Sequence, residues 1–423
     1  MTTLVILFGL FFILFLGVPI AFGMGVLTLI MMLAADISLL MIPQTFYSTA
    51  DNFVLLSVPM FLMMSNVLLK AGVGEDLFAM CQSWVGHITA GLAIATIFSC
   101  AIFASISGSS VATAATISVV AYPAMLKRGY NRKFILGTLA AGGTLGILIP
   151  PSIPMIVYAF VAEESVMKMF LAGIGPGIML TIFFVIYAYF YVKFFNKEVV
   201  NVQSTWQERV TYTKRGFPII VMAVLMLAGL YAGVYTPTEA GGIGFLMSLL
   251  YVLWMKRLTF DKFIEAGIDT MKTTVTVMII IAAATIFGKI ISLYRIPQDI
   301  SSYVVNTISS KGMFIFFVCI ILLILGFIME TLSLILIMMP IFALSLKTLN
   351  IDIIWFGIIF TIMIECALIT PPVGLNIYVL QDIAKAKMTE VGIGIIPFVI
   401  IMLFTVLVLY FFPNIALYIP FKL

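Results

Sequence analysis

Charged side chains are scarce in this sequence. Asp, Glu, Lys and Arg together make up 9% of its 423 residues, whereas 63% of the residues are hydrophobic. A soluble globular protein has too little interior to bury that much apolar surface, so the solvent of this chain must be largely lipid. The composition therefore excludes a soluble enzyme or binding domain, and no nucleic-acid partner is expected.

Histidine and cysteine are also too few to build a metal site. His87 is the only histidine, and the four cysteines form no CxxC pair, so neither a metal cluster nor a disulfide framework is predicted. A hydrolase inside the membrane would need an activated nucleophile and a base. The apolar segments contain no HExxH motif and no paired aspartates. We therefore expect neither an enzyme nor a transition-metal protein, and an intramembrane serine hydrolase is the rival from another class.

Long apolar runs take the place of the missing polar chemistry. Runs longer than about 18 residues recur along the whole chain, which indicates an all-α, multi-pass membrane protein. A β-barrel would show short alternating segments instead. The first run starts at Leu4 and passes Gly23 without a basic leader or a small-residue cleavage site, so no cleavable signal peptide is expected.

Polar turns divide the chain into expected spans and connectors. The run 4–33 contains Gly17-Val18-Pro19, so it is either one tilted helix or two shorter ones. Uninterrupted spans are expected at 53–69, 169–192, 217–235, 243–255, 273–293 and 391–412. Between them we expect a polar-aromatic connector at 36–52, amphipathic pieces at 72–87 and 257–272, and a polar connector at 196–215.

Two apolar segments are broken near their middle by a pair of prolines. The sequence GILIPPSIP at 146–154 interrupts the segment 134–162, and ITPPVGLN at 369–376 interrupts the segment 353–380. A break in a membrane helix leaves backbone groups without water, and it persists only inside protein or beside an aqueous cavity. The two Pro-Pro pairs lie 221 residues apart. Paired interruptions of this kind are the best sequence indication of a transporter's substrate site.

Two further apolar stretches have a polar centre. The stretch 88–120 contains SISGSS at 105–110, and the stretch 313–346 contains METLS at 329–333. The offset of 221 residues that relates the two breaks also relates these two centres. We predict two re-entrant helical hairpins. The alternative is a straight span whose serines bond back to carbonyls one turn earlier.

Basic clusters set the expected direction of each segment. A cluster at 127–133 precedes the first broken helix, and one at 385–387 follows the second. Because basic loops stay in the cytoplasm, the two copies should cross the membrane in opposite directions. This predicts an inverted-topology repeat. The first half is 1–215, with hairpin 88–120 and broken helix 134–162; the second is 216–423, with hairpin 313–346 and broken helix 353–380.

Hairpin tips and helix breaks that meet near the membrane centre would place half-helix ends around one cavity. N-terminal ends attract a carboxylate, whereas C-terminal ends and unwound carbonyls attract a cation. The predicted substrate contacts are Ser107, Ser109, Ser152, Pro154, Thr370 and Asn376. The predicted ligands of the first cation site are Ser105, Ser107, Gly108, Ser110, Gly146 and Pro150. Those of the second are Gly326, Glu330, Thr331, Thr370 and Gly374.

Two glutamates lie at membrane depth in these segments. A carboxylate inside a membrane is by default a hypothesis of function. Glu330 sits in the second hairpin tip, and we interpret it as linked to a cation. Glu365 is either functional or only a structural acceptor. Lys289, near the end of its span, is expected to snorkel, and Glu239, in a turn, is expected to have a structural role.

Four motifs in order resemble one known family. GSSVAT at 108–113, GILIPPS at 146–152, YTPTEAG at 235–241 and ITPPVG at 369–374 are similar to the large membrane subunit of TRAP transporters, the tripartite ATP-independent periplasmic transporters. The resemblance covers essentially the whole chain.

The resemblance implies more than the residues do alone. Members of this family import organic acids such as sialic acid or C4-dicarboxylates, coupled to sodium ions, by an elevator movement in the bacterial inner membrane. They act with a periplasmic substrate-binding protein and a small four-helix membrane subunit, which this chain lacks. Among the possible substrates the resemblance slightly favours sialic acid, although no residue decides it. A stand-alone sodium–carboxylate carrier with the same repeat plan is the nearest alternative, because it would need no binding protein.

Overall fold

The computed structural model describes residues 2–196, 199–201, 203–307, 310–372 and 374–422, and these residues form helices without any strand. Within this part of the chain, seven helices are long and apolar enough to cross a membrane, and one bent pair adds an eighth candidate. That pair is Arg132–Leu148 with Ile153–Val161, bent by 44°. The expectation of an all-α, multi-pass membrane protein is confirmed.

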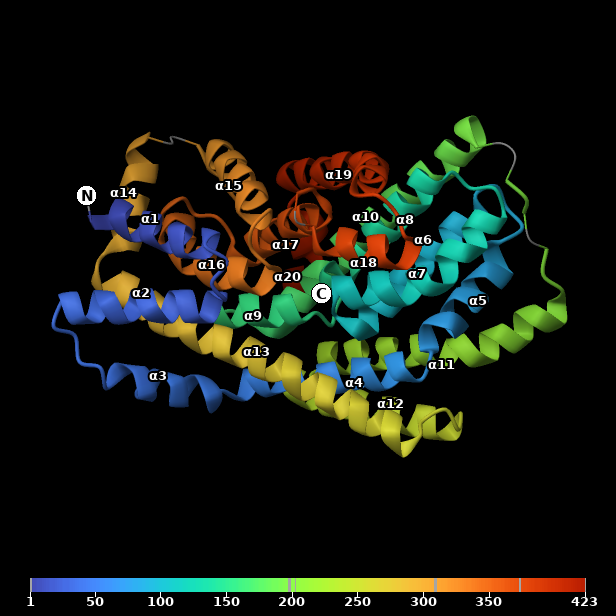
Figure 1. Ribbon diagram of the computed structural model, residues 1–423, viewed down its shortest axis with the longest axis horizontal. Coiled ribbons are helices and arrows are strands. Elements are labelled where there is room, and N and C mark those ends of the chain that lie inside the picture. The colour runs from blue at the N-terminus through green and yellow to red at the C-terminus, as the bar shows by residue number, and fades with distance from the viewer. Residues whose placement is uncertain (1, 197–198, 202, 308–309, 373, 423) are drawn as a thin grey trace.

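The first half of the chain contains the first hairpin and the first broken helix (Figure 1). Its helices are α1 (Thr2–Phe15), α2 (Ile20–Ala34), α3 (Met41–Ala50), the 3-10 helix η1 (Phe53–Leu56), α4 (Ser57–Lys70), α5 (Val73–Val85), α6 (Gly91–Ser107), α7 (Ser110–Lys127), α8 (Arg132–Leu148), α9 (Ile153–Val161) and α10 (Val166–Phe195). Helices α6 and α7 are the arms of the hairpin, and α8 and α9 are the two parts of the broken helix.

The second half repeats these elements after two additional helices. Its helices are α11 (Trp206–Tyr231), α12 (Pro237–Trp254), α13 (Phe260–Leu293), α14 (Ile296–Thr307), α15 (Lys311–Gly326), α16 (Thr331–Thr348), α17 (Ile353–Ile369), α18 (Leu375–Ala384), α19 (Met388–Phe411) and α20 (Asn414–Lys422). Helices α7 and α16 begin and end 221 residues apart, as do α8 and α17.

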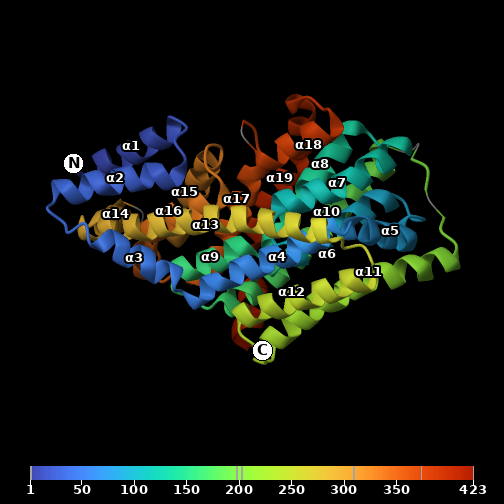
Figure 2. The same cartoon turned by 60° about the horizontal axis from the view of Figure 1, so that its bottom comes forward.

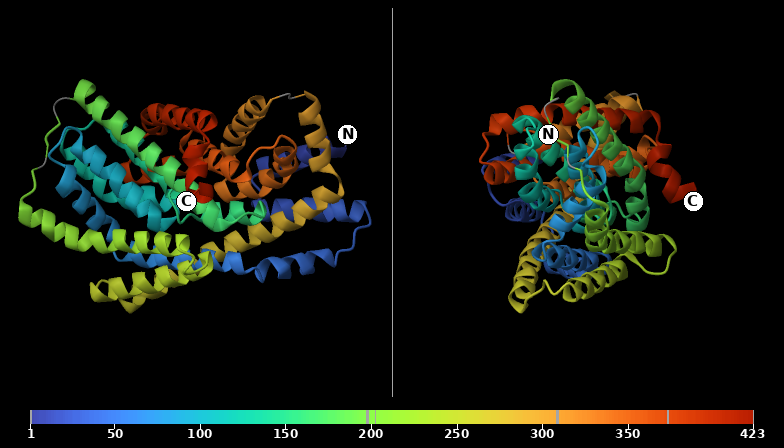
Figure 3. Two further views of the ribbon diagram at one scale, coloured as in Figure 1. Left: turned by 180° about the vertical axis from the view of Figure 1, so that it is seen from behind. Right: turned by 90° about the vertical axis from the view of Figure 1, so that its right-hand side faces the viewer.

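The helices form two layers. Helices α6–α10 and α15–α19 make a core bundle, in which α8 contacts α6, α7, α17 and α19. Helices α2–α4 and α11–α13 make an outer layer along one side of it, with α4 packed between α12 and α13. Figure 2 shows α13 running along most of the molecule, and the end view in Figure 3 shows the outer layer beneath the core bundle.

The centre of the core bundle is the most deeply buried part of the molecule. In α17 every residue from Ile354 to Ile369 is buried, and in α8 every residue from Phe134 to Leu148 is buried. These two helices end at the two proline breaks. The breaks therefore start from inside the protein, where unwound backbone is shielded from lipid.

Several expected boundaries were wrong, and helix caps explain part of the difference. The connector 36–52 contains α3, and the connector 196–215 is half helical. Helix α11 already starts at Trp206, because Thr205 and Glu208 form a capping box. The pieces 257–272 and 273–293 form one continuous helix, α13, which is capped by Thr259. Helix α7 extends to Lys127, well past the predicted end of the first hairpin.

Other parts of the chain were left open or missed. The run 4–33 is two helices, α1 and α2, which are separated around Gly17 and Pro19. The short helices α14 and α20 were not predicted, since neither has a long apolar run. The spans expected at 169–192, 217–235 and 391–412 correspond to α10, α11 and α19, each with shifted ends.

Candidate functional site

The two hairpin tips and the two helix breaks meet around one cavity of about 160 Å³. The outer layer closes its remaining side. The lining residues are Leu62, Gly108, Ser109, Ser110, Val111, Ile147, Ile153, Pro154, Thr273, Val277, Glu330, Thr331, Leu332, Leu368 and Leu375. Four segments that are far apart in the sequence are thus brought together.

Four helix N-termini point to this cavity. Ser110, Ile153, Thr331 and Leu375 are the first residues of α7, α9, α16 and α18, and each lines the cavity. The N-terminus of a helix carries partial positive charge and free N–H groups. Four such ends around a small space make a site suited to an anion such as a carboxylate.

The first hairpin tip turns at Gly108. This residue has a φ of +58°, a conformation that glycine adopts without the steric penalty of other residues. An added Cβ at Gly108 would also lie 2.9 Å from the carbonyl oxygen of Pro151. The Ser109 side chain then caps α7 by accepting a hydrogen bond from the N–H of Ala112 (3.4 Å). The tip is therefore packed tightly against the first break.

The hydroxyl groups of the first tip are mostly bonded within the tip. The Ser107 and Thr113 hydroxyls are 2.7 Å apart, and Thr113 Oγ1 donates to the carbonyl oxygen of Ser109 (2.8 Å). Ser105 Oγ donates to the carbonyl oxygen of Ile102, one turn earlier. These bonds hold the shape of the tip, and Ser105 and Ser107 do not line the cavity.

The first break is enclosed by protein. Helix α8 ends at Leu148 and α9 begins at Ile153, with a cis bond between Pro150 and Pro151. Gly146 allows the close approach of the first tip, because an added Cβ would lie 2.6 Å from the carbonyl oxygen of Ser109. Ser152 is buried, and its hydroxyl has no hydrogen-bond partner among the described residues. Pro154 lines the cavity, whereas Gly146, Pro150 and Ser152 lie behind the lining.

The second hairpin tip carries a charge. Glu330 is the N-cap residue of α16, and its Oε1 accepts a hydrogen bond from Ser333 Oγ (3.2 Å). Glu330 and Thr331 line the cavity. Gly326 ends α15 and packs against Ala367 of α17, so it supports the tip from behind.

The second break connects α17 to α18. Thr370 Oγ1 donates to the carbonyl oxygen of Cys366 (2.5 Å), and a cis bond joins Pro371 and Pro372. Val373 of the predicted motif lies outside the described residues. Thr370 and Gly374 flank the cavity without lining it, whereas Leu375 at the start of α18 is part of the lining.

Asn376 lies in a buried polar cluster rather than at the cavity. Its Nδ2 donates to Ser110 Oγ (2.8 Å), and Ser110 Oγ donates to Glu365 Oε2 (3.2 Å). The exposed fractions of Asn376, Ser110 and Glu365 are 0%, 2% and 1%. Within this cluster only Ser110 also lines the cavity, so the other two residues are placed to act from behind it.

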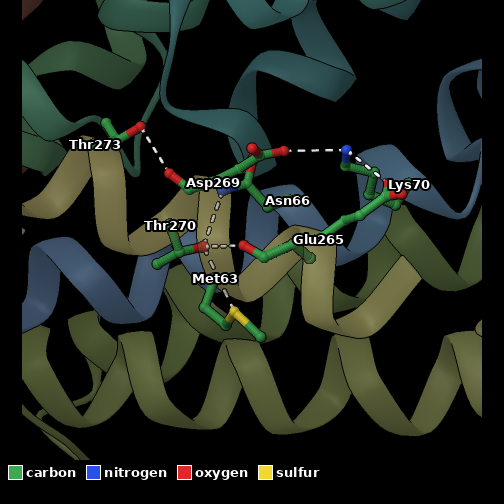
Figure 4. Close-up of polar contacts among 8 residues, drawn as sticks. Met63, Asn66, Lys70, Glu265, Asp269, Thr270 and Thr273 are labelled. Carbon is green, nitrogen blue, oxygen red and sulfur yellow. Dashed lines mark hydrogen bonds and ion pairs between the residues drawn. The ribbon is translucent and has the colours of Figure 1, made fainter. Parts of the chain in front are cut away.

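The outer-layer wall of the cavity was not predicted as part of the site. Leu62 of α4 and Thr273 of α13 line the cavity, and polar contacts continue from them along both helices (Figure 4). Asn66 Nδ2 donates to Thr270 Oγ1 (2.9 Å), and Thr273 Oγ1 donates to the carbonyl oxygen of Asp269 (3.0 Å). The four-residue spacing of 62 and 66, and of 269 and 273, could have indicated one helix face.

This polar row ends in an ion-pair cluster. Lys70 Nζ lies 3.2 Å from a carboxylate oxygen of Glu265 and 3.0 Å from one of Asp269 (Figure 4). The cluster ties the end of α4 to the first part of α13. It lies at the end of α4 that the basic loops assign to the cytoplasmic side. The row therefore runs from the cavity toward that side of the outer layer.

A larger cavity of about 790 Å³ lies between the two layers, farther along α13. It is lined by residues of α3, α9, α13 and α16 and includes Glu163, Glu164 and Lys289. Lys289 Nζ donates to Thr45 Oγ1 of α3 (3.0 Å). Lys289 thus bonds inside the protein, which differs from the expected snorkelling toward the membrane surface.

Two charged groups outside the spans have mainly structural roles. The Glu239 carboxylate accepts hydrogen bonds from the backbone N–H and the hydroxyl of Thr236, and these bonds lower the pKa of Glu239. The capping box starts α12, so the predicted structural role of Glu239 is confirmed. Arg257, just after α12, pairs with Asp76 of α5, and hydrogen bonding to Asp76 raises the pKa of the Arg257 guanidinium.

Comparison with known proteins gives consistent matches. A family model described as the DctM component of the tripartite ATP-independent periplasmic transporter matches residues 7–415. The C4-dicarboxylate TRAP transporter large permease protein of Pseudomonas aeruginosa is 35% identical over 375 residues, which is 88% of each chain. The sialic acid TRAP transporter large permease protein of Vibrio cholerae is 28% identical, over 98% of this chain and 97% of that protein. Among solved structures, the YdaH transporter of Alcanivorax borkumensis superposes with a TM-score of 0.65 at 14% identity, covering 99% of this chain and 98% of that one, which shows a shared fold.

Proposed function

The chain belongs to the DctM component family of the tripartite ATP-independent periplasmic transporters, and from this premise we propose that it imports an organic acid by sodium-coupled transport. It is a large permease component, and therefore a transporter subunit rather than an enzyme. The observation that carries the proposal is the convergence of four helix N-termini on the cavity between the two tips and the two breaks.

The substrate is proposed to bind as an anion at these helix ends. A carboxylate there would accept hydrogen bonds from free backbone N–H groups and from Ser109 and Thr331, which line the cavity. The neutral and apolar remainder of the lining leaves a small acid as the best fit. The relatives transport C4-dicarboxylates and sialic acid according to their names. Both acids are therefore candidate substrates for this chain.

Sodium ions are proposed to bind beside the anion. The C-terminal ends of α6, α8, α15 and α17 lie next to the tips and breaks, and unwound carbonyls together with helix C-termini attract cations. The lining carboxylate of Glu330 would add a negative charge at the second tip. One ion moved down a potential of 100 mV supplies about 2.3 kcal/mol, so the driving force is adequate.

The movement is proposed to be an elevator motion of the core bundle against the outer layer. The common 221-residue offset of α7 with α16, and of α8 with α17, supports two repeats, 1–215 and 216–423. The basic loops before the first broken helix and after the second support opposite directions through the membrane. The two layers in Figure 3 provide one part that can move and one that can stay fixed.

Partners and location follow from the family. We propose that the chain works in a bacterial inner membrane with a small four-helix membrane subunit and a periplasmic substrate-binding protein. A stand-alone carrier is the alternative, and it would differ in needing neither partner.

Reconstitution in proteoliposomes tests the proposal. The chain, with and without its small subunit, is assayed for uptake of radiolabelled acids from a panel that includes succinate and sialic acid. The proposal predicts uptake only when the binding protein and sodium are both present. Uptake by the chain alone would favour the stand-alone carrier, and equal rates with choline in place of sodium would contradict sodium coupling.

A further inference from the structure

The buried cluster of Glu365, Ser110 and Asn376 contains two oxygen atoms without a partner. Asn376 Nδ2 donates to Ser110 Oγ, whose own hydrogen goes to Glu365 Oε2. This direction of donation fixes the orientation of the Asn376 amide. Glu365 Oε1 and Asn376 Oδ1 then remain as buried acceptors that no donor reaches among the described residues.

Unpartnered acceptors at this depth are costly. Glu365 is 1% exposed, and the ion pairs of the described residues do not include it. A buried carboxylate without a counter-charge is strongly unfavourable in a protein interior. A proton on Oε1 would neutralise the charge, but it would turn an unpartnered acceptor into an unpartnered donor. A cation would satisfy both Glu365 Oε1 and Asn376 Oδ1.

We infer that this cluster binds one sodium ion, at a site separate from those proposed at the helix C-termini. A carboxylate and an amide oxygen, next to a hydroxyl, form an all-oxygen donor set that suits a small hard cation. The inference rests on the proposed sodium-coupled function and adds a specific ligand set to it. Glu365 and Asn376 are the proposed ligands, and Ser110 orients both.

The position of the cluster indicates what the ion would do. Ser110 starts the second arm of the first hairpin, whereas Glu365 and Asn376 lie on opposite sides of the second break. A cation held there would fasten the first tip to the second broken helix. Because Ser110 also lines the cavity, ion binding would order the wall on which the anion binds.

The cluster occurs on only one side of the repeat. The residue 221 positions before Glu365 is Thr144, whose hydroxyl donates to the carbonyl oxygen of Ala141. The residue 221 positions before Asn376 is Met155, which is fully buried. The equivalent place in the first half is therefore neutral and apolar, and we expect one such ion per chain rather than two.

Sodium binding to the purified full chain, in detergent with its small subunit, tests the inference without any transport assay. Binding of radioactive sodium is measured at equilibrium, and thermal unfolding is followed as sodium replaces choline at constant ionic strength. Glu365→Gln keeps the size of the side chain but removes the charge. We expect it to bind one sodium ion fewer than the wild type. The sodium concentration for half-maximal stabilisation should rise at least about tenfold, since even groups that only orient ligands contribute about 10- to 100-fold to metal affinity.

Two further variants keep the result interpretable. Asn376→Leu removes the second ligand and should give the same loss, which covers the case that Glu365→Gln does not fold. Thr144→Val alters the equivalent position in the first half and should leave the sodium count unchanged. If both ligand variants bind as many ions as the wild type with unchanged affinity, the inferred site is wrong while sodium coupling stands. If the wild type itself binds no sodium, both the site and the proposed coupling are wrong.

Discussion

The two proline breaks share one sequence plan but differ in their surroundings. In the first break, Pro150, Pro151 and Ser152 are all buried. In the second, Pro371 and Pro372 are exposed, although α17 before them is buried from Ile354 to Ile369. The first break is part of the packed interior, whereas the second reaches the surface. Segments with few buried contacts open at the lowest free-energy cost, so motion near the site should start at the second break.

The two tips differ in the same direction. Ser109 and Glu330 are N-cap residues of α7 and α16 and lie 221 positions apart, so they are equivalent in the two copies. The first is neutral and the second is charged. One copy therefore supplies a rigid neutral wall, and the other supplies the charge and the accessible edge. Equivalent positions in a repeat need not have equivalent functions.

The largest expected effect would come from breaking the tight packing of the first copy. Gly146→Val should reduce the free energy of unfolding by about 1–3 kcal/mol or more, because the added side chain collides with Ser109 and Thr113 at the tip. Thermal unfolding in detergent measures this, together with uptake. Gly267→Val in α13 is the matched control, because an added Cβ there meets nothing within 4 Å. Equal stability of the two variants would contradict the tight packing of the first break.

The charge difference between the tips predicts the next largest effect. Glu330→Gln should lower sodium-driven uptake by about tenfold or more, equivalent to 1.4 kcal/mol per factor of ten. Ser109→Ala should lower it less, because it removes one cap hydrogen bond worth about 1 kcal/mol. Initial uptake rates across a range of sodium concentrations give both values. A greater loss for Ser109→Ala would reverse the proposed division of roles.

Two buried hydroxyls of the first copy should have a smaller effect. Ser107→Ala loses its contact with Thr113, which contributes about 0.5–1.5 kcal/mol. Ser152→Ala removes a hydroxyl without a partner and should not destabilise the fold. Both variants should reduce uptake several-fold with little loss of expression, as measured by uptake per amount of purified protein. Wild-type uptake in both would remove these residues from the proposed site.

The smallest effect is a difference in access that leaves transport intact. Leu375 at the second break is 38% exposed, whereas Ile153 at the first break is 7% exposed. In a chain without its native cysteines, Leu375→Cys should react with a water-soluble maleimide about tenfold faster than Ile153→Cys, because thiol reactivity follows exposure. Similar labelling rates would contradict the unequal accessibility of the two breaks.

The sequence predicted the parts of this fold that depend on strong local signals. Proline pairs inside apolar runs located both breaks, and serine-rich or acidic centres located both tips, because such residues cannot continue a lipid-facing helix without support. The cavity could then be anticipated from the four segments. The ends of α11 and α13 could not, since polar residues at 206–215 and 260–272 form helix when they are capped and packed.

The contacts between distant segments were the least predictable part of the site. The outer-layer wall at Leu62 and Thr273 depends on how α4 and α13 pack against the core bundle, which no local pattern specifies. Asn376 was predicted to contact substrate because it follows the second break, but its side chain turns toward Ser110 and Glu365. One turn of a helix decides between cavity and interior.

The unbroken length of α13 has a mechanical consequence. Its 34 residues extend about 51 Å at 1.5 Å per residue, whereas the hydrocarbon layer is about 30 Å thick. The helix must either tilt steeply or project beyond the lipid, and it has no joint at which to bend. Thickness of the surrounding bilayer therefore acts directly on the strut that carries Thr273. Lipids with longer acyl chains would change its inclination and, with it, the shape of the cavity wall.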